Sequence, residues 1–272
     1  MISSKNPNES NATELGLCIT YPSAGIIERI GADWDWIWID AQHGQFGYND
    51  ILNLVRVCDL INRPAYVRVA GSEAGRIGQV LDMNVAGIVV PCVETAQEAK
   101  ELVKAAKMPP LGKRSFGGRR VIDRNTRRYA ERANHETKLI LQIETPEAMS
   151  NIESIAAVEG VDALFFGPDD MRIRLGLPMD RPPTEEVLGG ELTRMMEVCK
   201  AHRLKALTVA VTPGMFNFCY RLGMHMLVCA ADSRLIGDSS KHEAHSFREL
   251  IRSSRTALST VVPHPAQTKS VR

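Results

Sequence analysis

The chain has 272 residues, a length that fits one large α/β domain or two small ones. It is 44% hydrophobic and 24% charged, which is an ordinary globular balance with enough apolar material for a core. Its 33 basic and 32 acidic residues nearly cancel, so no overall field points to nucleic acid or an anionic membrane as a partner.

Eight short apolar runs alternate with helical patterns from one end of the chain to the other. Strands are expected at residues 16–21, 36–41, 63–69, 86–93, 138–144, 163–168, 205–211 and 226–232. Between them, apolar residues recur at the i, i+3, i+4, i+7 spacing of a helix face at 51–58, 99–106, 192–199 and 215–222. A last helix is expected around 247–251, and threonine–proline pairs at 145–146 and 212–213 indicate helix starts.

This alternation predicts a fold as well as its elements. Eight strands and helices in turn over about 250 residues are typical of a single (β/α)8 barrel, the TIM barrel. An open doubly wound sheet is the alternative, although no G-x-G-x-x-G follows the first strand. We expect the barrel domain at residues 15–256, between disordered tails at 1–14 and 257–272.

Cysteine usage and the N-terminus bear on the cellular compartment. The six cysteines are scattered without C-x-x-C pairs, which is typical of small core residues in a reducing compartment. The first residues contain no apolar segment of a signal peptide, and no apolar run reaches the roughly 18 residues of a membrane span. We therefore expect a soluble, cytoplasmic protein.

In TIM barrels the working residues lie at the carboxyl ends of the strands and in the loops that follow. The second strand ends in "WIWIDAQHG", which places Asp40 just before His43. A carboxylate can fix the tautomer of a nearby imidazole, so the two could form a catalytic pair, with a structural histidine as the alternative. Arg68 ends the third strand and requires a carboxylate, either from the protein or from a ligand.

Glu144 and Asp170 follow the fifth and sixth expected strands. Two carboxylates at neighbouring strand ends repel each other unless they share a cation or a proton. A hard divalent ion such as Mg²⁺ or Mn²⁺ prefers a few carboxylates with water in its other positions. The alternative is that each carboxylate caps the helix that follows it.

Lysine is missing from the strand ends. Lys138 and Lys205 lie at the amino ends of their strands, which is the wrong end of a barrel for a Schiff-base aldolase. Metal-assisted enolisation is therefore the favoured chemistry. The segment 113–132 carries eight basic and two acidic residues, and it is either a solvated basic surface or a funnel that draws anions to the barrel mouth.

Several motifs together resemble one known family. The block "QIETPEAMSNIESIAAVEGVDALFFGPDDM" closely resembles a block of the HpcH/HpaI aldolases, which include metal-dependent class II pyruvate aldolases. The stretches "WIWIDAQHG", "YVRV" and "PPLGKRSFGG" are similar to further segments of that family, in the same order. The resemblance runs from about residue 15 to 255.

The resemblance implies roles for the candidate residues. Glu144 and Asp170 would hold Mg²⁺, Mn²⁺ or Co²⁺. His43, oriented by Asp40, would be the catalytic base, and Arg68 would stabilise the enolate. Gln142 would contact the bound oxo acid, and the backbone N–H groups of the segment Gly167-Pro168-Asp169-Asp170, in which Pro168 has none, would receive its carboxylate. The substrates would be a small 2-oxo acid and an aldehyde, with pyruvate as a product. The family also implies a last helix exchanged between subunits of a homo-oligomer, a hexamer or a trimer.

Three departures from the family pattern leave the substrate open. Gln42 stands where a glutamate is common, Asp169 where a small residue is usual, and Arg172 where a small hydroxyl residue is frequent. We expect Arg172 to meet an anion at the far end of the substrate, or else to pair with Asp169. Two other functions compete with the aldolase, namely an acyl-CoA lyase of the same superfamily and a non-catalytic metabolite-binding barrel.

Overall fold

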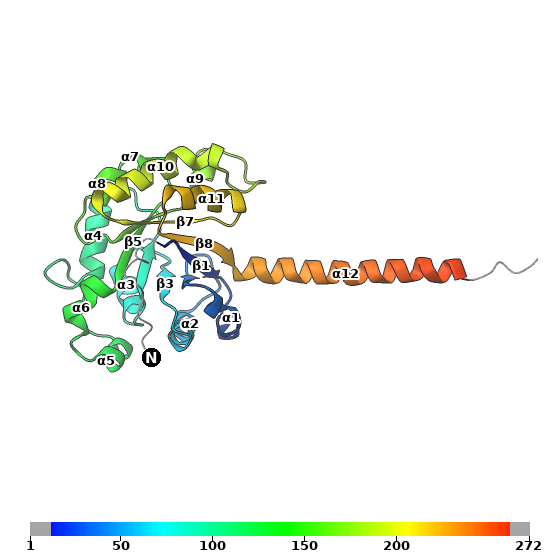
Figure 1. Ribbon diagram of the computed structural model, residues 1–272. Coiled ribbons are helices and arrows are strands. Elements are labelled where there is room, and N and C mark those ends of the chain that lie inside the picture. Colours follow the sequence, from blue (N-terminus) through cyan, green and yellow to red (C-terminus); the bar gives the residue numbers. More distant parts are fainter. Residues whose placement is uncertain (1–11, 262–272) are drawn as a thin grey trace, which may run out of the picture. The chain divides into compact units, whose positions relative to one another are not determined.

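The computed structural model describes residues 12–261, with side chains to residue 255, and its eight strands form a closed parallel barrel in chain order (Figure 1). Each strand pairs with the next one along the chain, and β8 closes the barrel against β1. The strands are β1 (Glu14–Ile19), β2 (Trp36–Asp40), β3 (Ala65–Arg68), β4 (Gly87–Val90), β5 (Lys138–Ile143), β6 (Ala163–Phe166), β7 (Lys205–Val209) and β8 (Met226–Ala231).

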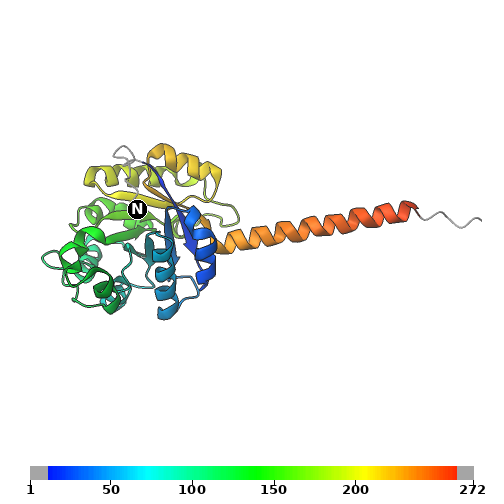
Figure 2. The ribbon, with the colours of Figure 1, turned by 60° about the horizontal axis from the view of Figure 1, so that its bottom comes forward.

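Helices up to α11 surround the strands, as two views of the barrel show (Figures 1 and 2). They are α1 (Ala24–Ile30), the 3-10 turn η2 (Gly31–Asp33), α2 (Tyr48–Leu60), α3 (Ala74–Leu81), α4 (Ala96–Ala106), α5 (Arg119–Asn125), α6 (Tyr129–Glu136), α7 (Pro146–Ser150), α8 (Ile152–Ala156), α9 (Pro168–Arg174), α10 (Glu185–His202) and α11 (Pro213–Leu222). The last helix, α12 (Asp232–Val261), lies almost wholly in a second compact unit that begins at Ser233. No helix within residues 12–261 has the length and apolar character needed to cross a membrane.

The interior of the barrel is filled by side chains at its amino end. Trp36 is 1% exposed and packs at right angles to Tyr66 with ring centroids 5.6 Å apart. A Cβ on Gly16 would lie 2.3 Å from the Trp36 ring, so β1 passes this indole only because residue 16 is glycine. Because this end is packed, the open space of the barrel lies at the carboxyl ends of the strands.

The predicted barrel and all eight of its strands are confirmed, and the doubly wound alternative is excluded. The strands are mostly shorter than the apolar runs, since the last residues of several runs already belong to loops. β1 begins at Glu14, and α12 continues through Val261, past the expected domain end at residue 256. The expected tails otherwise fall largely outside the described residues.

Candidate active site

A cavity of about 380 Å³ opens at the carboxyl end of the barrel. One part of its wall carries the polar groups and comes from β2, β3, β5 and the start of α9. The other part is apolar and comes largely from β1, β7 and β8. The lining residues are Asp40, His43, Arg68, Gln142, Glu144, Gly167, Pro168, Asp169 and Asp170 on the polar side, with Cys18, Trp38, Phe165, Val209, Val211, Val228, Ala230 and Ala231. Every predicted site residue except Arg172 is therefore brought together.

Asp40 and Arg68 form a buried ion pair across neighbouring strands. Their Cα positions are paired in the β2–β3 register, and the guanidinium donates from Nε and Nη2 to the two carboxylate oxygens at 2.8 and 2.6 Å. The guanidinium also lies 4.7 Å from the centre of the Trp38 ring. These contacts hold Arg68 in one orientation at the cavity wall.

The expected pairing of Asp40 with the imidazole of His43 is therefore wrong. Asp40 meets His43 only through the backbone, because its Oδ1 accepts the His43 N–H at 3.3 Å. The His43 side chain is exposed at the cavity and has no hydrogen-bond partner among residues 12–255. Asp40 prefers Arg68 because the register sets the two residues opposite each other, whereas His43 lies beyond the strand end.

Glu144 is the most deeply buried acid of the cavity, at 1% exposure. Its Oε1 accepts the backbone N–H and the thiol of Cys92 at 2.8 and 3.1 Å, and its Oε2 accepts the Gln142 amide. No Lys, Arg or His of the described residues forms an ion pair with it. A buried carboxylate without a cation is costly, so this arrangement favours a positive ligand.

Asp170 lines the same cavity as Glu144 and lies in the first turn of α9. Burial, the hydrogen bond to Glu144, and the charges of Glu144 and Asp170 together raise the pKa of the Cys92 thiol to about 11. The carboxylate of Asp170 has no hydrogen bond or ion pair within the described part of the chain. Neither acid is a helix cap, since Thr145 caps α7 and Gly167 precedes α9.

The junction between β6 and α9 brings the two acids together. A Cβ on Gly167 would lie 2.6 Å from Oε2 of Glu144 and 2.8 Å from Nε2 of Gln142. Only glycine therefore lets the chain pass this close to the acid and its amide partner. The Gly167 N–H donates to the Ile143 carbonyl at 3.0 Å, so it cannot bind a substrate carboxylate as expected. Pro168 has no N–H to donate.

The donor set fits a hard divalent ion that is only partly enclosed by protein. Mg²⁺ is commonly held by one or two carboxylates, with water and substrate oxygens completing its coordination. Within the described residues, no group of three or more His, Cys, Asp and Glu side chains is arranged to hold a metal. Glu144 and Asp170 thus suit an open metal site and do not suit a closed structural site.

Arg172 does not reach the cavity, which corrects its expected role. It is 5% exposed, and its Nη2 donates to the carbonyls of Pro178 and Arg181. Its Nη1 lies 3.6 Å from Oδ1 of Asp169. The side chain therefore holds the loop after α9. Of the two roles expected for Arg172, the structure shows the ion pair with Asp169.

The basic segment 113–132 does not lie at the cavity either. It belongs to the connection from α4 to β5, which returns the chain to the amino ends of the strands. Six of its seven arginines form ion pairs with acids. Of the two alternatives for this segment, the anion funnel at the barrel mouth is therefore wrong, because no residue of the segment lines the cavity.

Sequence reasoning missed Cys92 and the apolar half of the cavity. Cys92 was expected to be a core residue, yet it is exposed at the end of β4 with a φ of 56°. Its place near the carboxyl end of the expected strand 86–93 was the available signal. The valines and alanines of β7 and β8 carry no chemical signature, so their sequence gave no indication of a cavity wall.

Comparison with known proteins places the chain among aldolases. The family model described as HpcH/HpaI aldolase/citrate lyase matches residues 23–236. A 2-dehydro-3,6-dideoxy-6-sulfogluconate aldolase of Pseudomonas putida is 31% identical over 228 residues, which is 82% of this chain and 88% of that protein. A 4-hydroxy-2-oxovalerate aldolase of Novosphingobium aromaticivorans is 42% identical over 149 residues, which is 54% of this chain and 57% of that protein.

A solved structure agrees with these sequence matches. The crystal structure of an HpcH/HpaI aldolase from Desulfitobacterium hafniense DCB-2 superimposes with a TM-score of 0.79 at 24% identity, covering 89% of this chain and 95% of that one. The barrel is thus shared over nearly its whole length. Together with the family match, which spans most of the sequence, this shows that the chain belongs to the HpcH/HpaI aldolase/citrate lyase family.

Proposed function

We propose that this protein is a metal-dependent class II aldolase, which cleaves a 4-hydroxy-2-oxo acid to pyruvate and an aldehyde and also runs in reverse. The observation that carries the proposal is the pair of acids without cationic partners, Glu144 and Asp170, beside the fixed guanidinium of Arg68 in one cavity. The aldolases among its relatives support the same reaction class, carbon–carbon bond cleavage. No lysine of the described residues lines the cavity, so the groups seen there offer no amine for imine chemistry.

A divalent ion, Mg²⁺, Mn²⁺ or Co²⁺, held by Glu144 and Asp170, would polarise the oxo acid and offset the negative charge that develops on it. Other groups of the protein orient Glu144 and offer hydrogen bonds to the substrate. Gln142 and Cys92 donate to Glu144 and hold its carboxylate toward the cavity. The N–H groups of Asp169 and Asp170 have no acceptor in the described chain and can receive the substrate carboxylate.

Arg68 and His43 supply the remaining two functions, which are stabilisation of the enolate and removal of a proton. Asp40 accepts hydrogen bonds from Nε and Nη2 of Arg68, whereas Nη1 of Arg68 makes only a long contact of 3.4 Å with Gln142. That N–H can donate to the keto oxygen, where the enolate charge develops when the C3–C4 bond breaks. His43 is free to take the proton of the 4-hydroxyl group, directly or through water, which starts the cleavage.

The aldehyde portion of the substrate would face the apolar half of the cavity. Val209, Val228, Ala230 and Ala231 carry no side-chain donor for hydroxyl or anionic groups. Arg172, the expected anion contact, is committed to the α9–α10 loop. We therefore propose a short, uncharged aldehyde, in keeping with the relative named as a 4-hydroxy-2-oxovalerate aldolase.

Pyruvate release from a panel of 4-hydroxy-2-oxo acids, with and without metal, tests the proposal. We expect release from 4-hydroxy-2-oxovalerate with Mg²⁺ or Mn²⁺, and none after chelation. Acyl-CoA cleavage without aldol cleavage would indicate the lyase alternative, which lacks support because the basic segment lies away from the cavity. Binding of pyruvate without any turnover would instead indicate a metabolite-binding barrel.

A further inference from the structure

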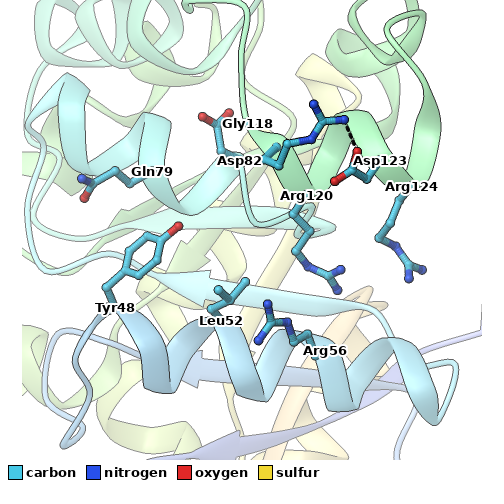
Figure 3. Close-up of a pocket in the computed structure, with 10 residues that line it drawn as sticks. Tyr48, Leu52, Arg56, Gln79, Asp82, Gly118, Arg120, Asp123 and Arg124 are labelled. Carbon is cyan, nitrogen blue, oxygen red and sulfur yellow. Dashed lines mark hydrogen bonds and ion pairs between the residues drawn. The ribbon is translucent and has the colours of Figure 1, made fainter.

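A second cavity, of about 450 Å³, lies outside the barrel strands, between α2, the end of α3 and α5 (Figure 3). We call it the arginine groove. It shares no lining residue with the barrel cavity. Its lining residues are Tyr48, Leu52, Arg56, Gln79, Asp82, Gly118, Arg119, Arg120, Asp123 and Arg124.

The groove depends on a specific backbone geometry. Gly118 has a φ of +84°, and a Cβ there would lie 2.7 Å from Cγ of Asp82. Only glycine allows this close approach, which starts α5 against the end of α3. Arg114, whose side chain is 3% exposed, donates to Asp82 at 3.0 Å and ties the preceding loop to the same point.

Positive charge is in excess around this groove. Asp82 is paired with Arg114, and Asp123 with Arg119. Asp59 is shared between Arg120 and Arg124. Arg56 donates to the Asn53 amide at 3.0 Å and has no acidic partner among the described residues. Five guanidinium groups thus meet three carboxylates, which leaves two positive charges uncompensated.

Arg120 is the least exposed of the arginines that line the groove, with 16% of its side chain exposed. Its Nε is buried and has no hydrogen-bond partner. Burial, followed by the charges of Arg124 and Arg56, lowers the pKa of this guanidinium, against the opposing effect of Asp59. Arg56, Arg120 and Arg124 therefore lie close enough to repel one another, and an anion between them would relieve that repulsion.

The groove has a different character at its other end. Figure 3 shows Arg56, Arg120 and Arg124 on one side and Tyr48 and Gln79 on the other. Tyr48 is 51% exposed, so its ring offers apolar surface to a ligand.

We propose that the arginine groove binds a phosphate monoester of a small organic molecule, with the phosphate against the three arginines and the organic part along Tyr48 and Leu52. The phosphate carries close to two negative charges at pH 7, which matches the two uncompensated positive charges of the groove.

Calorimetric titration of the full-length protein tests this proposal with adenosine 5′-monophosphate, adenosine and inorganic phosphate as probes. We expect saturable binding of the monophosphate, binding of inorganic phosphate weaker by about tenfold or more, and no binding of adenosine at the same concentrations. Arg56→Gln should weaken binding of the monophosphate by about tenfold or more, because it removes a charged donor that is paired with no acid of the described residues.

Arg29→Gln is the matched control, since Arg29 is an exposed arginine in the last turn of α1, outside the groove. It should leave the affinity unchanged, and saturating pyruvate with Mg²⁺ should not displace the monophosphate. The proposal is overturned if no probe binds, or if Arg29→Gln weakens binding as much as Arg56→Gln. Displacement by pyruvate, or equal affinity for inorganic phosphate, would overturn it as well. None of these readouts depends on aldolase activity.

Discussion

Glu144 accepts three hydrogen bonds at the carboxyl end of β5, yet no cation accompanies it within residues 12–255. Asp40, an acid buried almost as deeply, is compensated by Arg68. The two carboxylates therefore play different parts, because one fixes a cation of the protein and the other remains available for a cation from solution. This contrast supports assigning Glu144 to the metal and Asp40 to the positioning of Arg68.

Replacing either proposed metal-binding acid should remove metal affinity before it removes the fold. We expect Glu144→Gln and Asp170→Asn to weaken Mn²⁺ binding by at least about tenfold, since each removes a charged oxygen ligand. Asp169→Asn is the control, because Asp169 is exposed and its one ion pair, with Arg172, is long. Titration calorimetry measures the affinity and circular dichroism the fold. Full activity of the dialysed wild type in excess EDTA would contradict the metal assignment.

His43 and Asp40 should give different mutant phenotypes. His43→Ala should lower kcat by roughly 10²–10⁴, the usual loss when a general acid–base is removed, with little change in melting temperature. Asp40→Asn should instead cost about 3–5 kcal/mol of unfolding free energy, because it leaves the buried Arg68 uncompensated. Steady-state kinetics and urea unfolding separate the two. An unchanged kcat in His43→Ala would show that the histidine is structural.

At the scale of elements, the site is built by two junctions at the carboxyl ends of strands. Cys92 lies two residues after the end of β4, and its left-handed backbone accompanies the donation of its N–H and thiol to Glu144. Gly167 follows directly after β6 and packs on Glu144 and Gln142 of the neighbouring strand end. These junctions fix the acid from two sides, so the geometry of the metal site depends on backbone packing as much as on the ligands.

Gly167→Ala tests that dependence. The added Cβ meets Glu144 and Gln142 at distances that atoms do not tolerate, so the acid or α9 must shift. We expect a lower melting temperature and Mn²⁺ affinity weaker by about tenfold or more, comparable to the loss of other groups that orient a metal ligand. Gly190→Ala in α10 is the control, because a Cβ there meets nothing within 4 Å and should be neutral or stabilising. Equal Mn²⁺ affinities in the two variants would contradict the proposed role of Gly167.

For the whole molecule, the distribution of charge follows the topology of the barrel. The acids and the histidine of the cavity lie at the carboxyl ends of the strands and just beyond them, while the basic segment belongs to an αβ connection at the opposite end. The second unit contributes a different kind of surface. Its helix α12 exposes Ile236, Phe247, Leu250 and Ile251, an unusual amount of apolar surface for one helix. The expected homo-oligomer, with this helix exchanged between subunits, remains a prediction.

The charge distribution leads to an expectation for substrate choice. The ratio of kcat/KM for a neutral aldehyde to that for an anionic one, measured in the aldol direction, should favour the neutral aldehyde. Arg172→Ser should leave this ratio unchanged, since Arg172 contacts loop carbonyls and not the cavity. Added salt should change kcat/KM for the neutral aldehyde little. A preference for the anionic aldehyde that disappears in Arg172→Ser would restore the role first expected for this arginine.

The barrel, the family and the residues at the ends of the strands could all be predicted from the amino-acid sequence alone. Apolar runs and helical spacing are local patterns that a sequence shows directly. The carboxyl ends of the strands of such a barrel meet at one rim, so the sequence was enough to predict that Arg68, Glu144 and Asp170 lie together. The partners of these residues were decided only by the tertiary structure. Asp40 pairs with Arg68 across 28 residues of sequence because strand register sets them opposite each other. Arg172 turns to the carbonyls of its own loop, and the basic segment packs beside α2 and α3, because close packing and chain connectivity place them there. Such contacts depend on distances between segments far apart in the chain, about which a local pattern of residues carries no information.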